Sequence, residues 1–351
     1  MDKDILYIWL NKIKGIGPIL ANNLLNYFGN IEEVYISTVD ELLKVEGIGE
    51  KLAKGIMESK KLDSSKMIFE NCIKSNIQII TKYSDDYPSV LLSQPKAPLI
   101  LYVKGILKEF DESVAIVGAR RCNEYGKRVT VELAESLSAN KIPIISGMAK
   151  GIDSYAHTVA LNNDNYTIAV LGTGVDKCYP SEHINLMNKI IEKGAVISQF
   201  EPGTSNVKEN FLKRNELIAM LSNKIVVVQA SKDSGSLYTA KCGMKFNKEV
   251  YAVPSIIYDK FSEGSNMLIN NGAKVYLSTE SIVNKVTIVT NSVNISDIET
   301  KVINIVKNKP ISIDIVIRML GLTPQRVEEL ITEMELKGVI IQVGGLIKQA
   351  R

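Results

Sequence analysis

The chain has 351 residues, which is more than one compact core usually contains, so two or three domains are expected. Hydrophobic residues make up 45% and charged residues 23%, which is typical of a folded globular protein and excludes disordered, collagen-like and membrane-spanning classes. Because 42 Lys+Arg stand against 39 Asp+Glu, the formal net charge is only +3. This excludes a protein that coats DNA with its whole surface, so any nucleic-acid site must be local.

The cysteines and the apolar runs predict the compartment. Cys72, Cys122, Cys178 and Cys242 are widely separated and form no C-x-x-C pair, so neither a zinc site nor a disulfide framework is expected. The amino terminus lacks the small-residue cleavage site of a signal peptide, and no apolar run approaches membrane-spanning length. These features predict a protein of the reducing cytoplasm without a membrane partner.

The first segment contains an internal repeat. In LNKIKGIGPILANNLLNYFG and LLKVEGIGEKLAKGIMES, a G-I-G triplet, at 15–17 and at 47–49, lies between helical patterns. This resembles a tandem helix-hairpin-helix (SAM-like) module, in which glycines permit a tight turn before a helix N-terminus. Two interpretations stay open: the backbone N–H groups hold a phosphate, or the turns only join packed helices. We assign residues 1–62 to this helical domain.

The central segment, residues 63–289, alternates short apolar runs with amphipathic helical patterns. Strands are predicted at 114–118, 142–146, 167–172, 195–200, 224–230 and 249–254. These runs are continuously apolar, as expected for a parallel sheet that helices cover on both faces. Right-handed crossovers then give a doubly wound, Rossmann-like α/β domain. The part before it, residues 66–105, is interpreted as an extended lead-in.

Residues 290–351 read as a polar linker, at 290–296, followed by a winged helix. Helices are predicted at 297–308, 312–320 and 324–337, and a hairpin is predicted to turn at Gly344-Gly345. The third helix carries Glu328, Glu329, Glu333 and Glu335 against Arg326 and Lys337. Because a helix in a DNA groove meets dense phosphate charge, this acidic face favours a protein-contact or regulatory role.

The loops that follow the predicted strands are rich in glycine, serine and basic residues. Open parallel sheets bind ligands beyond the carboxyl ends of their strands, where small residues and helix N-termini let backbone N–H groups approach a phosphate. Basic side chains add charge there, and Phe211 offers a ring for stacking bases. The candidate nucleic-acid-binding residues are Arg120, Ser146, Gly147, Lys150, Gly151, Gly172, Gly174, Phe211, Lys213, Arg214, Asn215, Ser234, Gly235 and Ser236.

Some of these residues also have purely structural interpretations. Ser146 and Asp153 can cap the helix after the second strand, a role we favour for Asp153. Gly172 and Gly174 can simply permit a tight turn, which is compatible with a binding role for their N–H groups.

The sequence carries no sign of cofactor or catalytic chemistry. It contains no G-x-x-x-x-G-K-[ST] loop and no G-x-G-x-x-G fingerprint after the first strand, so no nucleotide cofactor is expected. The two histidines, His157 and His183, stand in no nucleophile, base or metal constellation. We interpret His157 as a packing or hydrogen-bonding residue and expect neither catalytic residues nor a metal site.

Taken in order, the motifs of the chain are similar to those of the DNA processing protein A (DprA/Smf) family. They are VAIVGARRCNEYG, IISGMAKGIDSYAH, TIAVLGTGVDKCYP, FLKRNELIAMLS, VVVQASKDSGSLYTA and GSNMLINNGA. The resemblance covers nearly all of the chain. It implies a sequence-independent single-stranded DNA-binding protein that loads RecA onto incoming DNA during natural transformation, displacing or bypassing the single-strand-binding protein. It also implies a homodimer without enzymatic activity.

The chain departs from the family pattern at a few positions. Glu216 stands where a second arginine is common, Gln199 and Gln229 stand where glutamates are usual, and Ser255 replaces a glycine. Glu216 is expected to lower DNA affinity.

Two other functions compete with DNA binding. A Rossmann-like nucleotide-processing hydrolase would use similar loops, but its expected PGGxGT-type loop is absent from the sequence. A pure interaction scaffold would not require the basic, glycine-rich loops that this chain retains.

Overall fold

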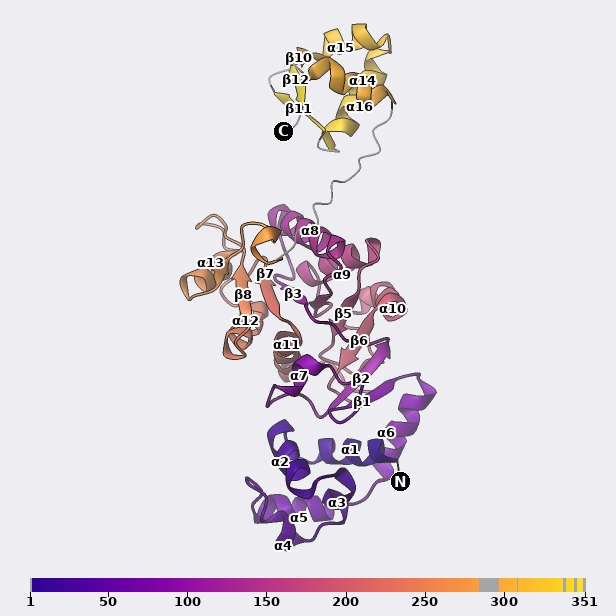
Figure 1. The fold of residues 1–351 in the computed structure, drawn as a ribbon, viewed down its shortest axis with the longest axis vertical. Helices are drawn as coiled ribbons and strands as arrows, with labels where there is room; N and C mark the ends of the chain where they lie inside the picture. Colours follow the sequence, from indigo (N-terminus) through magenta and orange to yellow (C-terminus); the bar gives the residue numbers. More distant parts are fainter. Residues whose placement is uncertain (1, 284–296, 308, 337–338, 344–345, 350–351) are drawn as a thin grey trace. The chain divides into compact units, whose positions relative to one another are not determined.

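The computed structural model describes residues 2–283, 297–307, 309–336, 339–343 and 346–349 (Figure 1). The linker predicted at 290–296, the turn predicted at Gly344-Gly345 and Lys337 lie outside the described residues. The chain divides into two compact units, Met1–Thr287 and Ile288–Arg351. Along the described residues, no helix combines the length and the apolar character needed to cross a membrane.

The first unit begins with short helices that confirm the predicted repeat. They are α1 (Lys3–Lys12), α2 (Pro18–Phe28), α3 (Ile31–Ile36), α4 (Val39–Leu42), α5 (Glu50–Glu58) and α6 (Asp63–Lys74). Gly15 and Gly47 precede α2 and α5 with positive φ angles of 93° and 84°, which only glycine adopts without strain. A side chain at Gly15 would lie 2.8 Å from Leu52, and one at Gly47 would lie 2.6 Å from Leu20. The two hairpins therefore pack against each other in equivalent ways.

A mixed sheet forms the centre of the first unit. Its strands are β1 (Gln78–Thr81), β2 (Ile100–Gly105), β3 (Val114–Val117), β4 (Ile144–Ser146), β5 (Thr167–Val170), β6 (Ala195–Ser198), β7 (Lys224–Val227), β8 (Glu249–Ala252) and β9 (Lys274–Val275). Among the described residues their order is β1-β2-β6-β5-β4-β3-β7-β8-β9. The six predicted strands are confirmed, each somewhat shorter than expected, and they pair in parallel. From β3 the chain adds β4, β5 and β6 on one side, and it then returns to add β7 and β8 on the other side of β3. The strand order therefore reverses between β3 and β7, although these two strands are parallel.

The segment expected to be an extended lead-in has more structure than its sequence indicated. It contains α6, the short helix α7 (Ser89–Leu92) and an antiparallel pair, β1 and β2, in which Gln78 pairs with Val103. Strand β2 also pairs antiparallel with β6, so this segment extends the sheet. The reason that the pattern misled is that β1 is only four residues long and becomes buried only at its last two positions.

Helices cover both faces of the sheet, as predicted. They are α8 (Glu124–Ala139), α9 (Ile152–Asn162), α10 (Ile184–Lys193), α11 (Lys208–Leu221), α12 (Gly235–Lys245) and α13 (Glu263–Asn270). Leu133 of α8 belongs to a core with Ile116 and Val226, whereas Leu217 of α11 belongs to another core with Val117 and Val227. The alternating side chains of β3 and β7 thus point into two different layers.

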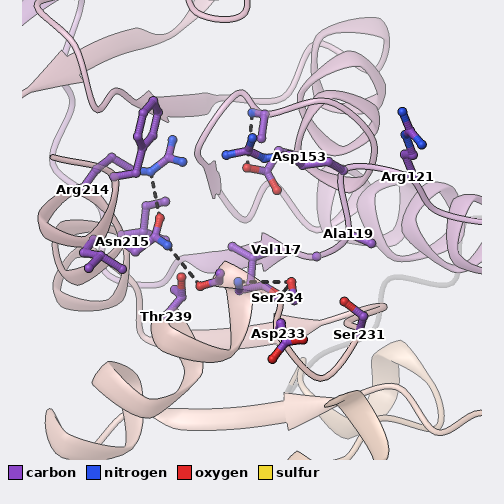
Figure 2. Close-up of a pocket in the computed structure, with 18 of the residues that line it drawn as sticks. Val117, Ala119, Arg121, Asp153, Arg214, Asn215, Ser231, Asp233, Ser234 and Thr239 are labelled. Carbon is purple, nitrogen blue, oxygen red and sulfur yellow. Dashed lines mark hydrogen bonds between the residues drawn. The ribbon is translucent and has the colours of Figure 1, made fainter. Parts of the chain in front are cut away.

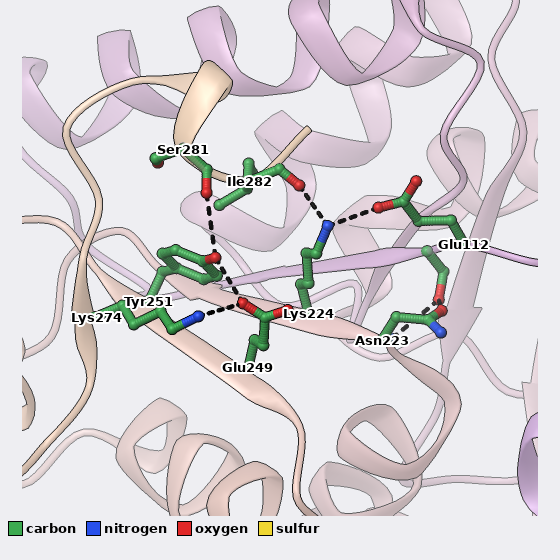
Figure 3. A network of polar contacts seen from close by, with 9 residues as sticks. Glu112, Asn223, Lys224, Glu249, Tyr251, Lys274, Ser281 and Ile282 are labelled. Carbon is green, nitrogen blue, oxygen red and sulfur yellow. Dashed lines mark hydrogen bonds and ion pairs between the residues drawn. The ribbon is translucent and has the colours of Figure 1, made fainter. Parts of the chain in front are cut away.

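A polar network fixes the last described part of the first unit (Figure 3). Lys224, at the start of β7, is 9% exposed, and its Nζ lies 2.7 Å from Glu112 Oε1 and 2.5 Å from the Ile282 carbonyl oxygen. Nearby, the Tyr251 hydroxyl lies 2.8 Å from Glu249 Oε2 and 3.2 Å from the Ser281 carbonyl oxygen, so its one hydrogen can reach either acceptor. These bonds hold residues 281–282 against the sheet.

The second unit is a winged helix, as predicted. It contains α14 (Asp297–Val306), β10 (Ile311–Ser312), α15 (Ile313–Leu320), α16 (Pro324–Leu336), β11 (Ile340–Val343) and β12 (Leu346–Gln349). Its described strands pair in the order β10-β12-β11. Helix α15 ends at Gly321, whose left-handed φ of 64° is the usual helix stop. Val302, Val316 and Ile331, one from each helix, meet in its core.

Candidate nucleic-acid interface

A cleft of about 830 Å³ lies beyond the carboxyl ends of β3 and β7, where the strand order reverses (Figure 2). Ligands of doubly wound sheets bind at such a reversal because the loops on either side diverge there. The lining comes from the β3–α8 loop at 118–121, the β7–α12 loop at 231–236, helix α11 and residues 260–261. Of the predicted site residues, this cleft brings together Arg120, Phe211, Arg214, Asn215, Ser234, Gly235 and Ser236.

Arg214 is the most buried basic side chain at the cleft, with 6% of its surface exposed. Its Nη1 donates to the carbonyl oxygens of Gly147 and Val170, and its Nε donates to Asn215 Oδ1 at 2.8 Å. These bonds tie α11 to the ends of β4 and β5. Burial lowers the pKa of Arg214, and the nearby carboxylate of Asp153 opposes that shift. Arg214 thus combines a structural role with a charge at the wall of the cleft.

Asp153 organises the loop between β4 and α9. Its Oδ2 accepts the backbone N–H of Gly147 at 3.1 Å and that of Ala149 at 3.4 Å. Burial raises the pKa of Asp153, while Arg214 and the two N–H donors lower it. The prediction that Ser146 or Asp153 caps this helix is wrong: the N-cap of α9 is Gly151, with φ 78°, and no side chain bonds there. Asp153 lies inside the helix and instead holds the loop before it. The Gly147 N–H is therefore already bonded within the protein.

The glycines of this region make room for other side chains. A side chain at Gly147 would overlap the Arg214 guanidinium, and one at Gly172 would lie 2.8 Å from the Phe211 ring. Gly174 donates its N–H to the Thr204 carbonyl at 3.1 Å. Ser146, expected near the helix cap, is buried and donates its hydroxyl to the Ile116 carbonyl at 2.6 Å. These residues position the site, and Ser146, Gly151, Gly172 and Gly174 do not line the cleft.

Phe211 lies in an aromatic and cationic group. Its ring centroid is 5.4 Å from that of Tyr179, and the guanidinium carbon of Arg214 lies 5.6 Å from the same centroid. A smaller hollow of about 60 Å³ beside it is lined by Arg120, Gly147, Ala149, Lys150, Tyr179, Pro180, Phe211 and Arg214. Tyr179 is 38% exposed and was not among the predicted site residues. The pattern that could have identified it is an aromatic residue in a carboxyl-end loop.

The charges around the cleft are mainly positive. Within the described residues, its basic lining side chains are Arg120, Arg121, Lys208, Arg214 and Lys260, and its acidic ones are Asp153 and Asp233. Three of these basic residues were not among the predicted site residues: Arg121, Lys208 and Lys260. Lys208 and Lys260 follow no predicted strand directly, so only the fold brings them to this edge.

The predicted basic residues differ in how available they are. The Arg120 side chain is exposed and forms no hydrogen bond or ion pair with the part of the chain that the structure describes. Lys150 pairs with Glu182 at 2.5 Å. Lys213 is exposed on α11 and lines neither the cleft nor the smaller hollow. Arg120 is therefore the predicted cation that is best placed for an external anion.

The β7–α12 loop presents a helix N-terminus to the cleft. Ser234 is the N-cap of α12, and its Oγ accepts the Ser236 N–H at 3.4 Å. The Asn215 side chain donates to the Gly235 carbonyl at 3.2 Å, which joins α11 to this loop. A helix N-terminus carries a partial positive charge that favours anions. The cleft therefore combines this partial charge with the formal charges of its basic side chains.

Comparison with known proteins identifies the family. Residues 78–287 match the family described as DNA recombination-mediator protein A. The chain belongs to this family. Residues 10–61 match a SAM-like helix-hairpin-helix tandem, and residues 291–345 match the DprA winged helix domain. The predicted family and the predicted fold class are both confirmed.

Individual relatives agree with this assignment. The chain is 34% identical over 281 residues to Protein Smf of Synechocystis sp., covering 78% of this chain and 71% of the relative. It is 38% identical over 199 residues to the DNA processing protein DprA of Streptococcus pneumoniae, covering 56% of this chain and 70% of that one.

Two solved structures resemble this fold. DprA from Streptococcus pneumoniae matches with a TM-score of 0.71 at 30% identity, over 82% of this chain and 99% of that one. DNA processing protein A from Helicobacter pylori, described for its single-stranded DNA binding mode, matches with a TM-score of 0.54 at 30% identity, over 59% of this chain and 94% of that one.

The positions where this chain departs from the family pattern have distinct surroundings. Glu216 does not line the cleft, and its carboxylate accepts a hydrogen bond from the Tyr238 hydroxyl. Gln229 is buried, where its Oε1 accepts the Asn123 N–H at 3.1 Å and its Nε2 donates to Ser262 Oγ at 3.2 Å. Its amide also faces Asp259 Oδ2 at 3.5 Å, where a glutamate would place a second negative charge. The substitution at 229 thus suits this neighbour.

Proposed function

We propose that this chain binds single-stranded DNA, without sequence preference, in the cleft at the carboxyl ends of β3 and β7. The observation that carries the proposal is the exposed Arg120, whose side chain bonds none of the described residues and which shares one cleft with the N-terminus of α12 and the ring of Phe211. Arginine and a helix N-terminus suit phosphates, and an aromatic ring suits unstacked bases. The Helicobacter pylori relative, described for its single-stranded DNA binding mode, supports this assignment.

The proposed biological role is that of a cytoplasmic recombination mediator. The protein would load RecA onto incoming single-stranded DNA during natural transformation, displace or bypass the single-strand-binding protein, and act as a homodimer. Family membership supports this role. A mediator of this kind must accept any sequence, which follows if its contacts are made to phosphates and to the faces of bases.

The protein acts without catalysis in this proposal. One of the two acidic side chains at the cleft, Asp153, already accepts two backbone N–H groups and faces Arg214. His157 is buried in α9, and its Nδ1 lies 2.7 Å from Thr167 Oγ1. Neither His157 nor His183 lines the cleft. Asp153 and His157 are thus already bonded within the protein, and the proposed function needs neither of them for proton transfer.

The test is the binding of fluorescent oligo-dT and of matched duplex, measured across a salt series. Arg120→Ala combined with Lys208→Ala removes two cleft charges, and Arg128→Ala removes an exposed arginine on α8 that pairs with Glu132. We expect the wild type and Arg128→Ala to prefer the single strand, and the double variant to lose most of its affinity while staying folded. Equal binding by all three proteins, or no preference for the single strand, would reject the proposal.

A further inference from the structure

The loop at residues 255–262, between β8 and α13, exposes an unusual number of apolar side chains. Ile256 is 74% exposed, Ile257 is 75%, Tyr258 is 88% and Phe261 is 50%. Soluble proteins rarely leave large apolar side chains clustered in water unless that surface contacts something. These exposed side chains therefore indicate a surface that contacts a ligand or a partner.

The same loop holds the polar side chains of Asp259 and Ser262 in bonds within the protein, whereas Lys260 is exposed. Asp259 Oδ2 accepts the Ser262 hydroxyl at 2.8 Å, and Asp259 Oδ1 accepts the Phe261 N–H at 2.9 Å. Asn266 of α13 bonds the backbone of Ser255 in both directions, at 3.1 Å each. This pattern, polar inside and apolar outside, is the reverse of the usual one. The bonds hold the loop in one conformation that presents its rings to solvent.

The loop is also connected to the proposed DNA cleft. Lys260 and Phe261 line that cleft together with Arg120 and Arg121. Gln229 joins the two walls, because it accepts the Asn123 N–H at 3.1 Å and donates to Ser262 at 3.2 Å. A strand whose phosphates lie at the arginines would thus share the cleft with the Phe261 ring, and Tyr258 lies three residues before Phe261 in the same loop.

From this arrangement we infer that the 255–262 loop is a second base-stacking platform, on which Tyr258 and Phe261 contact bases of the strand held in the cleft. The inference rests on the proposed function. Alternating aromatic and basic residues beside a phosphate site are the device by which proteins hold single strands without reading sequence. Phe211 of α11 lines the same cleft, and the Tyr179 ring lies against the Phe211 ring. The strand would thus meet aromatic rings from α11 and from the 255–262 loop.

The first experiment compares two strands of equal length, oligo-dT and a strand whose nucleotides are all abasic, which keeps the phosphates and removes the bases. The variant Tyr258→Ala/Phe261→Ala should bind oligo-dT roughly thirtyfold or more weakly than wild type, because two stacks are lost. Its affinity for the abasic strand should not change. Tyr27→Ala, which removes a ring that is 50% exposed on α2, is the matched control and should leave both affinities unchanged.

A second variant gives a readout that does not depend on affinity. The chain has one tryptophan, Trp9, which is buried in α1, so Tyr258→Trp adds a single exposed reporter. Its fluorescence should be quenched by oligo-dT and not by the abasic strand.

Each other outcome has a definite meaning. Unchanged oligo-dT affinity in the double variant would overturn the inference and assign the apolar loop to a protein partner. Equal losses on both strands would overturn base stacking in favour of a phosphate or structural effect. If the wild type itself bound neither strand, the proposed function would fail, and the inference with it. A failure confined to the variant leaves wild-type binding intact, so the two failures are distinguishable.

Discussion

Two loops at the same edge of the sheet have similar compositions and opposite structural roles. The β4–α9 loop is closed: Asp153 bonds its N–H groups, and Arg214 bonds the Gly147 carbonyl. The β3–α8 loop is open at its arginine: the Ala119 N–H bonds the Gln229 carbonyl at 2.7 Å, whereas the Arg120 side chain is exposed and bonds none of the described residues. Glycine and basic residues therefore indicate a loop that needs close approach, and the partner can be the protein itself or a ligand.

The largest effect should come from Arg214 of α11, which bonds the closed β4–α9 loop. Arg214→Ala is expected to lower the free energy of unfolding by about 3–5 kcal/mol, because it leaves Asp153 buried without the opposing charge and leaves carbonyl groups unbonded. Urea unfolding followed by circular dichroism measures this change, and Arg120→Ala serves as the control that should unfold like wild type. If Arg214→Ala kept full stability and lost only DNA affinity, the role of Arg214 would be to bind DNA, as proposed for Arg120, and not to hold the loop.

The next effect separates two cations that the sequence placed together. Arg120→Ala is expected to weaken oligo-dT binding by about 1.5–3 kcal/mol, the usual contribution of a hydrogen bond to a charged group. The slope of log affinity against log salt should also fall by about 0.7, which corresponds to one phosphate contact on a single strand. Lys213→Ala should change both quantities much less, because Lys213 does not line the cleft. Equal losses in the two variants, in a fluorescence-anisotropy titration, would show that the bound strand also reaches α11's outer surface.

Much of the architecture could be predicted from the sequence, because it is encoded in local patterns. The six parallel strands are continuous apolar runs, and the repeated G-I-G triplets mark the two hairpins. The pair β1 and β2 was missed because β1 has only four residues and the two strands join the sheet through long-range pairs, β1 with β2 and β2 with β6. Pairing between distant segments is a tertiary property that periodicity does not carry.

The candidate site could be predicted in place but not in detail. The rule that ligands bind beyond the carboxyl ends of strands located the cleft. It could not show that Gly172 makes room for Phe211, or that Lys260 reaches the cleft from the loop after β8. Which glycine faces a ligand and which faces a side chain depends on packing across the sheet, and this information is spread over residues far apart in the chain.

The stability of the protein should depend on pH through His157, which is buried in α9, the helix that follows the closed loop. Burial lowers the pKa of His157 from its ordinary 6.5 to about 3, so the folded protein keeps this imidazole neutral. As pH falls below 6.5, the unfolded chain binds a proton that the folded chain does not, and stability decreases until about pH 3. The expected loss between pH 7 and pH 5 is about 2 kcal/mol, and urea unfolding at the two pH values measures it.

The control for that experiment is His157→Gln, which removes the titrating group. It should reduce the dependence on pH in this range, whatever its effect on stability at pH 7. His183→Gln is the matched variant, since His183 is only partly buried and its Nδ1 lies 2.9 Å from the Met148 carbonyl oxygen. A decrease in stability at pH 5 as large in His157→Gln as in wild type would assign the pH effect to other groups.

The smallest effects extend the comparison to two glycines in other loops at this edge of the sheet, Gly172 after β5 and Gly235 at the start of α12. Gly172→Ala should cost about 1 kcal/mol or somewhat more, because its methyl group would lie 2.8 Å from the Phe211 ring and must displace it. Gly235→Ala should change stability by less than about 0.5 kcal/mol, since the nearest atom to its methyl group would be Asn215 Nδ2 at 3.9 Å. For oligo-dT affinity we expect the opposite order, because a methyl group at 235 would stand at the N-terminus of α12, where a phosphate would bind. If Gly235→Ala reduced oligo-dT affinity more than Gly172→Ala while remaining the more stable of the two, the glycine after β5 would be shown to serve packing and the glycine at the N-terminus of α12 to serve binding.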